Sequence, residues 1–170
     1  TSSGTSGRST IMVRDQDSIN KTVESFYLAF QRYFGMRAEH RAIFIMPQHS
    51  RIAMARMASF SVRRVGLAED HVHYTIPFAA YPDQVRVRAG RTYQEGWQGW
   101  VEKRLKNPFM NWAYEHQVMP QAIKQTVRLL EMAQAQGDKV LVFSAWSLLH
   151  AVALDFSSHH KILKLPAGSV

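Results

Sequence analysis

The sequence has 170 residues, no cysteine, and a formal net charge of +8 from 21 Lys and Arg against 13 Asp and Glu. The lack of cysteine excludes a disulfide-stapled miniprotein and any cysteine-ligated zinc, haem or iron–sulfur centre. A hydrophobic content of 46% and a charged content of 20% are typical of a globular domain. No apolar stretch approaches the roughly 18 residues of a membrane span. We therefore expect a soluble protein without membrane contact, located in the cytoplasm or nucleus or within a nucleoprotein particle.

The first part of the chain predicts a tail, a helix and a strand. Residues 1–10 contain no large apolar side chain, so we expect a flexible tail in front of a single compact domain over residues 11–170. Apolar residues recur at helical spacing over 19–34, and Gly35 is placed to end this helix. The apolar run at 42–46 stops at a proline and predicts a buried strand.

The middle of the chain is harder to interpret. Residues 51–65 fit neither the helical nor the strand period, and we predict a helix to about Ala58 followed by a strand. Two strands are predicted at 71–78 and 84–89, joined by a turn that contains Pro82.

The last part of the chain predicts a helix-rich unit. Its expected elements are three helices, a strand, a helix and a closing strand, over residues 92–105, 108–113, 120–136, 139–144, 147–156 and 162–165. Pro108 and Pro120 are expected to start new helices, and Gly137 to end one. The sequence as a whole predicts a mixed α+β or α/β, helix-rich domain with a small sheet and a C-terminal helix-strand-helix-strand unit. A sub-boundary near residue 106 is left open.

The positive charge lies mainly in the first two thirds of the chain. Residues 1–106 hold 16 of the 21 basic and 9 of the 13 acidic side chains, whereas residues 107–170 are nearly balanced. Fourteen of the basic residues are arginine, whose planar fork suits phosphate. The candidate phosphate contacts are Arg63, Arg64, Arg86, Arg88, Arg91, Lys103, Arg104 and Lys106. The alternative is a solvated face that only keeps the protein soluble.

Aromatic residues are interleaved with this charge, namely Tyr93, Trp97, Trp100 and Trp112. Aromatic rings beside basic side chains offer stacking surfaces for nucleic-acid bases. Their helical spacing favours a different interpretation, in which they pack into the core.

His71 and His73 are two residues apart on a predicted strand, so both imidazoles are expected on one side, where they could bind one divalent metal. The run 69–74 resembles the His-hydrophobic-His strand of HUH endonucleases. That resemblance implies metal-dependent nicking of single-stranded DNA by a tyrosine nucleophile, which we do not assign. The alternative is a pair of ordinary sheet-face histidines, and no cofactor is otherwise expected.

A longer stretch, 124–156, resembles the entry to the second RecA-like lobe of Swi/Snf-type helicases. Lys124, Gly137 and the run 138–144 match that pattern residue by residue, and Ala145 stands where the family has Gln. The resemblance implies a lobe fragment that works only when joined to an ATP-binding lobe, with its first strand in a parallel sheet. The alternative is generic helix-strand-helix packing.

These features lead to one preferred function and three alternatives. We expect a basic, non-catalytic protein that contacts nucleic-acid phosphates without sequence preference, as a packaging, coat or accessory subunit with protein partners or self-assembly. The alternatives are a translocase-lobe fragment, a metal-dependent single-strand nuclease, and a structural subunit whose basic face meets an acidic protein.

Overall fold

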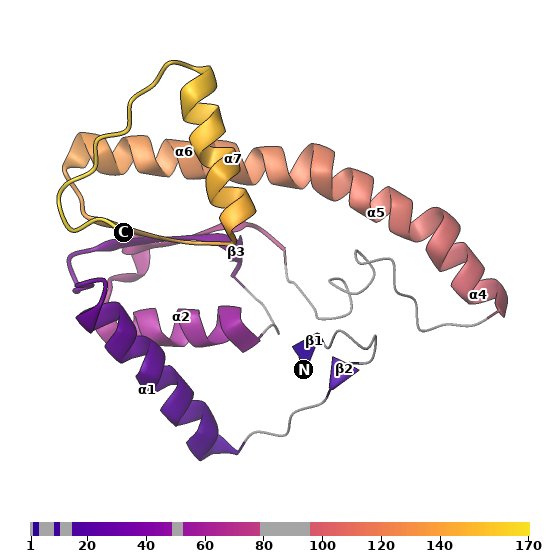
Figure 1. Ribbon diagram of the computed structural model, residues 1–170, viewed down its shortest axis with the longest axis horizontal. Helices are drawn as coiled ribbons and strands as arrows, with labels where there is room; N and C mark the ends of the chain where they lie inside the picture. Colours follow the sequence, from indigo (N-terminus) through magenta and orange to yellow (C-terminus); the bar gives the residue numbers. More distant parts are fainter. Residues whose placement is uncertain (1, 4–8, 11–14, 49–52, 79–95) are drawn as a thin grey trace.

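The computed structural model describes residues 2–3, 9–10, 15–48, 53–78 and 96–170 (Figure 1). In this part of the chain a three-stranded sheet lies between helices, which confirms the expected helix-rich α+β class. Two short strands near the N-terminus, β1 (Ser2–Ser3) and β2 (Ser9–Thr10), pair antiparallel with each other.

The centre of the fold is strand β3 (Arg41–Pro47). It pairs in parallel with β4 (Val72–Ile76) on one side and with β5 (Val140–Phe143) on the other. A parallel sheet is covered on both faces, and the first five residues of β3 are accordingly all buried. The three strands confirm the expected strands in these regions, and the strand expected at 84–89 lies outside the described residues.

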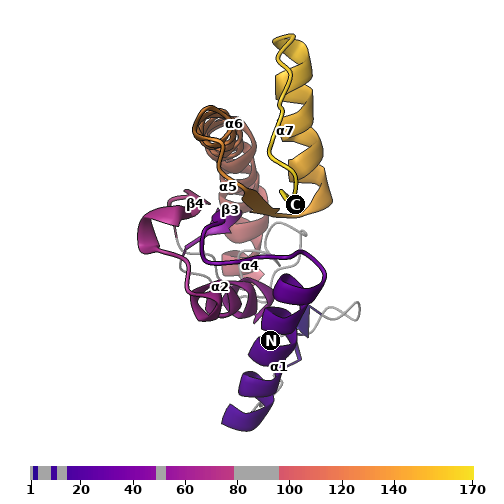
Figure 2. The ribbon, with the colours of Figure 1, turned by 90° about the vertical axis from the view of Figure 1, so that its left-hand side faces the viewer.

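One face of the sheet is covered by α1 (Gln16–Arg32) and α2 (Ala53–Val65), which lie below the strands in Figure 2. Phe44 of β3 and Phe30 of α1 both pack there on the ring of Phe143 of β5, with ring centroids 5.9 and 6.3 Å away, and both side chains are fully buried. Burying a side chain of this size contributes roughly 2 kcal/mol. Helix α1 is the helix expected at 19–34.

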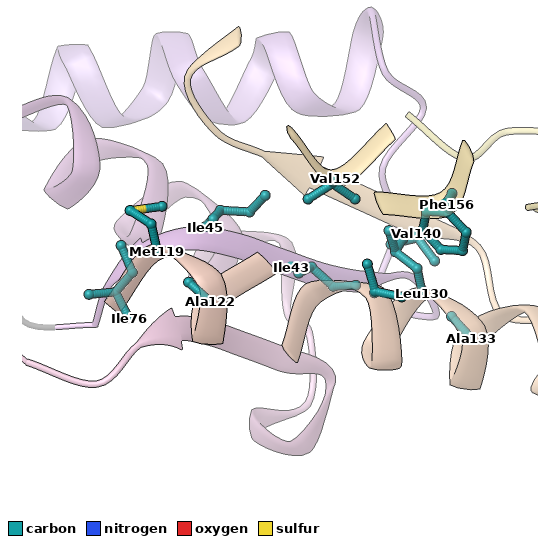
Figure 3. Close-up of a cluster of buried hydrophobic side chains, with 11 residues drawn as sticks. Ile43, Ile45, Ile76, Met119, Ala122, Leu130, Ala133, Val140, Val152 and Phe156 are labelled. Carbon is teal, nitrogen blue, oxygen red and sulfur yellow. The ribbon is translucent and has the colours of Figure 1, made fainter. Parts of the chain in front are cut away.

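The other face is covered by α6 (Met119–Gln136) and α7 (Trp146–Ser158). Figure 3 shows Ile43 of β3 and Val140 of β5 meeting Leu130 of α6 and Phe156 of α7. Because β4 and β5 lie on opposite sides of β3, right-handed connections through α2 and α6 place these helices on opposite faces.

Helix α2 is longer than the sequence predicts. The strand expected after Ala58 does not form, and α2 continues to Val65. Ala58 and Val62 are one helical turn apart and fully buried on the sheet, and the Ser61 hydroxyl donates to the Met57 carbonyl at 2.8 Å. The buried residues of this stretch therefore lie on one side of a helix that packs on the sheet.

The closing strand expected at 162–165 is also wrong. Its apolar side chains Leu163 and Leu165 pack against the core, but the Lys164 N–H donates to Gln134 Oε1 at 2.6 Å. The outer edge of β5 is met instead by Val170. The Val170 N–H donates to the Val140 carbonyl and the Val142 N–H donates to the Val170 carbonyl, in the pattern of a parallel bridge.

The three helices expected between 92 and 136 form one uninterrupted helical stretch from Gly96 to Gln136. In chain order it consists of α4 (Gly96–Val101), the π-helical segment η2 (Glu102–Lys106), α5 (Asn107–Ala113), the π-helical segment η3 (Tyr114–Val118) and α6. The α-helices α5 and α6 begin one residue before Pro108 and Pro120, close to the expected starts, but no break precedes either proline, and the sub-boundary left open near residue 106 falls inside this helical stretch.

Both prolines follow a π-helical segment, which explains why the helix continues. A proline inside an α-helix lacks the N–H donor, and its ring clashes with the carbonyl four residues earlier. Before Pro108, the Asn107 N–H donates to the Glu102 carbonyl, five residues back. Before Pro120, the Met119 N–H donates to the Tyr114 carbonyl in the same way. The wider π turn accommodates each proline within the helix.

Arg41 links the three strands at their amino ends. Its residue exposure is 8%, and its Nη2 lies 2.7 Å from Asp138 Oδ2, in the turn between α6 and β5. The same nitrogen donates to Gln136 Oε1 at 3.0 Å, and Nη1 lies 2.9 Å from His73 Nε2 on β4. The buried guanidinium is thereby supplied with hydrogen-bond acceptors, as a charge in a protein interior requires.

Replacing Asp138 should destabilise the fold. Asp138→Ala leaves the buried Arg41 charge without its carboxylate, and we expect the free energy of unfolding to fall by about 2–3 kcal/mol. The matched control is Glu131→Ala, which breaks the exposed pair between Glu131 and Lys161 and should cost less than about 1 kcal/mol. Urea unfolding followed by circular dichroism measures both. Equal losses would contradict the role given to the Arg41 contact.

Candidate nucleic-acid interface

The helical stretch from Gly96 to Val118 extends beyond the sheet, with α4 at its tip (Figure 1). We call this stretch the arm. It runs without interruption into α6, which lies on the sheet, so the arm is held at one end by the folded domain. Many side chains of this projecting helix are exposed to solvent.

Four large aromatic side chains of the arm are exposed to solvent. The exposed fractions are 74% for Trp97, 54% for Trp100, 65% for Phe109 and 49% for Trp112. The expectation that the arm's tryptophans pack into the core is therefore wrong. Their helical spacing reflects a real helix, but this side of it is not covered. Tyr93 lies outside the described residues.

The exposed rings are arranged in two pairs. Trp97 and Trp100 have ring centroids 6.1 Å apart and planes inclined by 16°. Phe109 and Trp112 have centroids 6.3 Å apart and planes inclined by 27°. Trp112 also stacks on His116, with centroids 5.3 Å apart. Each pair thus presents nearly parallel aromatic faces.

The π-helical segment η2 brings the two pairs to one side of the arm. Phe109 lies twelve positions after Trp97, and Trp112 lies twelve positions after Trp100. In a regular α-helix, twelve residues leave two side chains roughly 120° apart around the axis. A π turn takes up one extra residue and reduces this angle to roughly 20°. We call the resulting surface, formed by the four rings, the aromatic face.

Sequence reasoning missed Phe109 as a member of this surface. The signal that could have found it is the repeated spacing of twelve residues combined with Pro108 directly before Phe109. The spacing alone predicts different sides of a helix, and only the extra residue of the π turn brings the pairs together.

A basic cluster lies on η2, between the two aromatic pairs. Lys103, Arg104 and Lys106 are all exposed, and within the described part of the chain none of them has an ion-pair partner. Glu102 is the acidic residue of this segment. We call the three cations the basic cluster. They are three of the eight residues that the sequence proposed as phosphate contacts.

The other proposed contacts do not join the basic cluster. Arg64 pairs with Glu24 at 2.6 Å and lies 5.3 Å from the ring centroid of Tyr27, so it ties α2 to α1. Arg63 is exposed next to it, in the last turn of α2, and α2 covers the face of the sheet opposite to α6. The remaining candidates, Arg86, Arg88 and Arg91, lie outside the described residues.

The proposed metal-binding histidines do not share a strand. His71 belongs to a short 3₁₀ turn, Glu69–His71, and only His73 lies on β4. His73 Nε2 faces the Arg41 guanidinium at 2.9 Å, so a metal ion at this atom would have to displace a cation. Among the described residues, no group of three or more His, Cys, Asp or Glu side chains could hold a metal ion.

The chain matches no protein-family model, and it has no significant match among curated proteins or among solved structures. The resemblances at 69–74 and 124–156 therefore stay predictions from sequence. For the second of them, the strand at 140–143 is parallel to β3, while the neighbour expected at 162–165 is not a strand. In the described part of the chain, no helix combines the length and hydropathy that a membrane crossing requires.

The contact between His73 and Arg41 should make stability depend on pH. Burial, followed by the Arg41 charge, lowers the pKa of His73 below its ordinary value of 6.5. As the pH falls below about 6.5, the unfolded chain binds a proton that the folded chain does not, so the free energy of unfolding decreases until the lower folded pKa is reached. Above pH 6.5 this contribution is fully present.

His73→Gln should flatten this pH dependence, because the amide oxygen still accepts from Arg41 but does not titrate. The measurement is a series of urea unfolding curves between pH 7 and pH 5. His150→Gln, at an exposed position on α7, is the matched control and should follow the unsubstituted protein. An unchanged pH slope in His73→Gln would contradict the assignment.

Proposed function

We propose that this protein binds nucleic acid without sequence preference, through phosphate contacts made by the basic cluster of the arm. The observation that carries the proposal is three exposed cations, Lys103, Arg104 and Lys106, on a helix that projects from the domain between exposed aromatic rings. Side chains committed to structural pairs, such as Arg64, are not part of this site.

The charge of the whole chain supports a polyanionic partner. The net charge of +8 attracts nucleic acid over a Debye length of about 10 Å at moderate salt, and it raises the rate of encounter. Each phosphate that is neutralised releases condensed counterions, which favours binding at low salt. Since phosphates carry no direct sequence information, contacts of this kind position a protein on nucleic acid irrespective of its sequence.

The shape of the molecule supports the same partner. An arm that projects from the domain can lie against a nucleic-acid backbone without interference from the sheet and its helices (Figure 1). Binding that depends on charge and shape suits a packaging, coat or accessory role within a larger assembly, and we propose a role of this class for the protein.

Removing the basic cluster should weaken binding to all sequences alike. In the triple variant Lys103→Gln, Arg104→Gln and Lys106→Gln, we expect the affinity for random-sequence oligonucleotides at low salt to fall by about tenfold or more. The slope of log K against log salt should become shallower by roughly 2 on single strands. Fluorescence anisotropy at several salt concentrations measures both quantities.

The matched control removes the same charge elsewhere. Lys124→Gln, Arg128→Gln and Lys164→Gln replace three exposed cations on α6 and after α7. This variant should bind nearly as well as the unsubstituted protein. If both triple variants lose the same affinity, net charge rather than the arm accounts for binding, and the proposed site is wrong.

A further inference from the structure

We propose that the aromatic face of the arm stacks on unpaired bases, so that the nucleic acid bound by this protein is single-stranded. The inference rests on the proposed function, because the basic cluster supplies the phosphate contacts, and it adds the class of ligand. The aromatic face consists of Trp97, Trp100, Phe109 and Trp112, as defined above.

The first argument is the exposure and orientation of the rings. Four large apolar side chains, each about half exposed or more, lie on one side of a projecting helix. Leaving such rings in water forgoes roughly 2 kcal/mol of burial for each. The rings within each pair are nearly parallel, so they offer π faces, which stack on any base irrespective of its identity.

The second argument is the position of the charge. The basic cluster on η2 lies along the chain between Trp100 and Phe109. A single strand that places bases on both aromatic pairs must run past η2, where its phosphates meet Lys103, Arg104 and Lys106. In a duplex the bases are already paired and stacked within the helix. The duplex can therefore use the basic cluster but not the aromatic face.

The same position of the charge argues against a second copy of the chain as the partner. Two arms that matched their aromatic pairs, in either direction, would bring η2 of one chain next to η2 of the other. That arrangement would oppose six cations at close range, which electrostatic repulsion disfavours. Single-stranded nucleic acid supplies the opposite charge at this point.

The first test uses the full chain with oligo(dT), oligo(U) and a duplex of equal length. Trp100→Ala combined with Trp112→Ala removes one ring from each pair, and the affinity for single strands should fall by about tenfold or more. Duplex affinity should change by less than about twofold, because the basic cluster is intact. Comparing oligo(dT) with oligo(U) distinguishes DNA from RNA as the preferred single strand.

Two variants serve as controls for this test. Trp100→Phe with Trp112→Phe keeps a ring at each position and should restore most of the single-strand affinity. Trp146→Ala removes an even more exposed tryptophan, 81% exposed on α7, and should have no effect. Circular dichroism confirms that each variant is folded.

The tryptophans also provide a direct signal. The chain has four, of which Trp97, Trp100 and Trp112 lie on the aromatic face and Trp146 does not. In a Trp146→Phe variant, all tryptophan fluorescence comes from the arm. We expect quenching by oligo(dT) or oligo(U) and little quenching by the duplex, since only unpaired bases stack on the rings.

A second variant tests the role of the π turn while keeping all four rings. Inserting one alanine between Val101 and Glu102 adds a residue that the π turn of η2 does not take up, so it undoes the alignment that this turn produces and rotates the pair Trp97 and Trp100 by roughly 100° relative to the pair Phe109 and Trp112. All three cations of the basic cluster remain. Single-strand affinity should fall toward that of the double tryptophan variant, and duplex affinity should persist.

Several outcomes would overturn the inference. If the double tryptophan variant binds single strands as before, the aromatic face does not stack on bases, although salt-dependent binding through the basic cluster would still support the proposed function. If it instead converts a dimer to a monomer in sedimentation, or abolishes binding to anionic vesicles, while nucleic-acid affinity is unchanged, the face belongs to a second copy or to a lipid surface. If the basic-cluster variant binds normally, the proposed function itself fails.

Discussion

The structure depends on the burial of one strand on both of its faces. β3 lies between two parallel neighbours, and a parallel pair cannot be closed by a hairpin, so the chain must cross over the sheet to return. These crossovers supply α2 for one face and α6 for the other. Successive side chains of β3 thereby pack on opposite layers of helices, with Ile43 directed toward α6 and Phe44 toward α1 and α2. Arg41, at the amino end of the same strand, fixes the register by joining β4 and the turn before β5.

Much of this arrangement is readable from the sequence, because the relevant signals are local. The apolar run before Pro47, the aromatic periodicity of α1 and the left-handed Gly137 after α6 each specify one conformation without reference to distant residues. The prediction is wrong where one sequence pattern is compatible with two different structures. Leu163 and Leu165 alternate as in a strand, yet their side chains pack on the core while the backbone between them bonds to a glutamine side chain on α6.

The candidate site was harder to predict than the fold, for a physical reason. The residues of the basic cluster can be predicted from charge alone. Which other basic residues lie near them depends on tertiary packing, and Arg64 instead pairs with Glu24 between α1 and α2. Pro108 and Pro120 normally indicate helix starts, and here a wider turn before each proline relieves the clash. That turn also changes which side of the helix Phe109 occupies, so a regular helical projection misplaces half of the aromatic face.

The continuity of the helix from Gly96 to Gln136 has a mechanical consequence. At about 1.5 Å per residue it extends for roughly 60 Å, with α6 packed on the sheet and α4 at the far end of the arm. Such a rod acts as a lever, because a force applied near its tip becomes a torque on α6. The lever ends at Gln136, whose side-chain oxygen accepts a hydrogen bond from Arg41 Nη2. A torque on the arm would therefore reach the Arg41 contacts at the amino ends of the three strands.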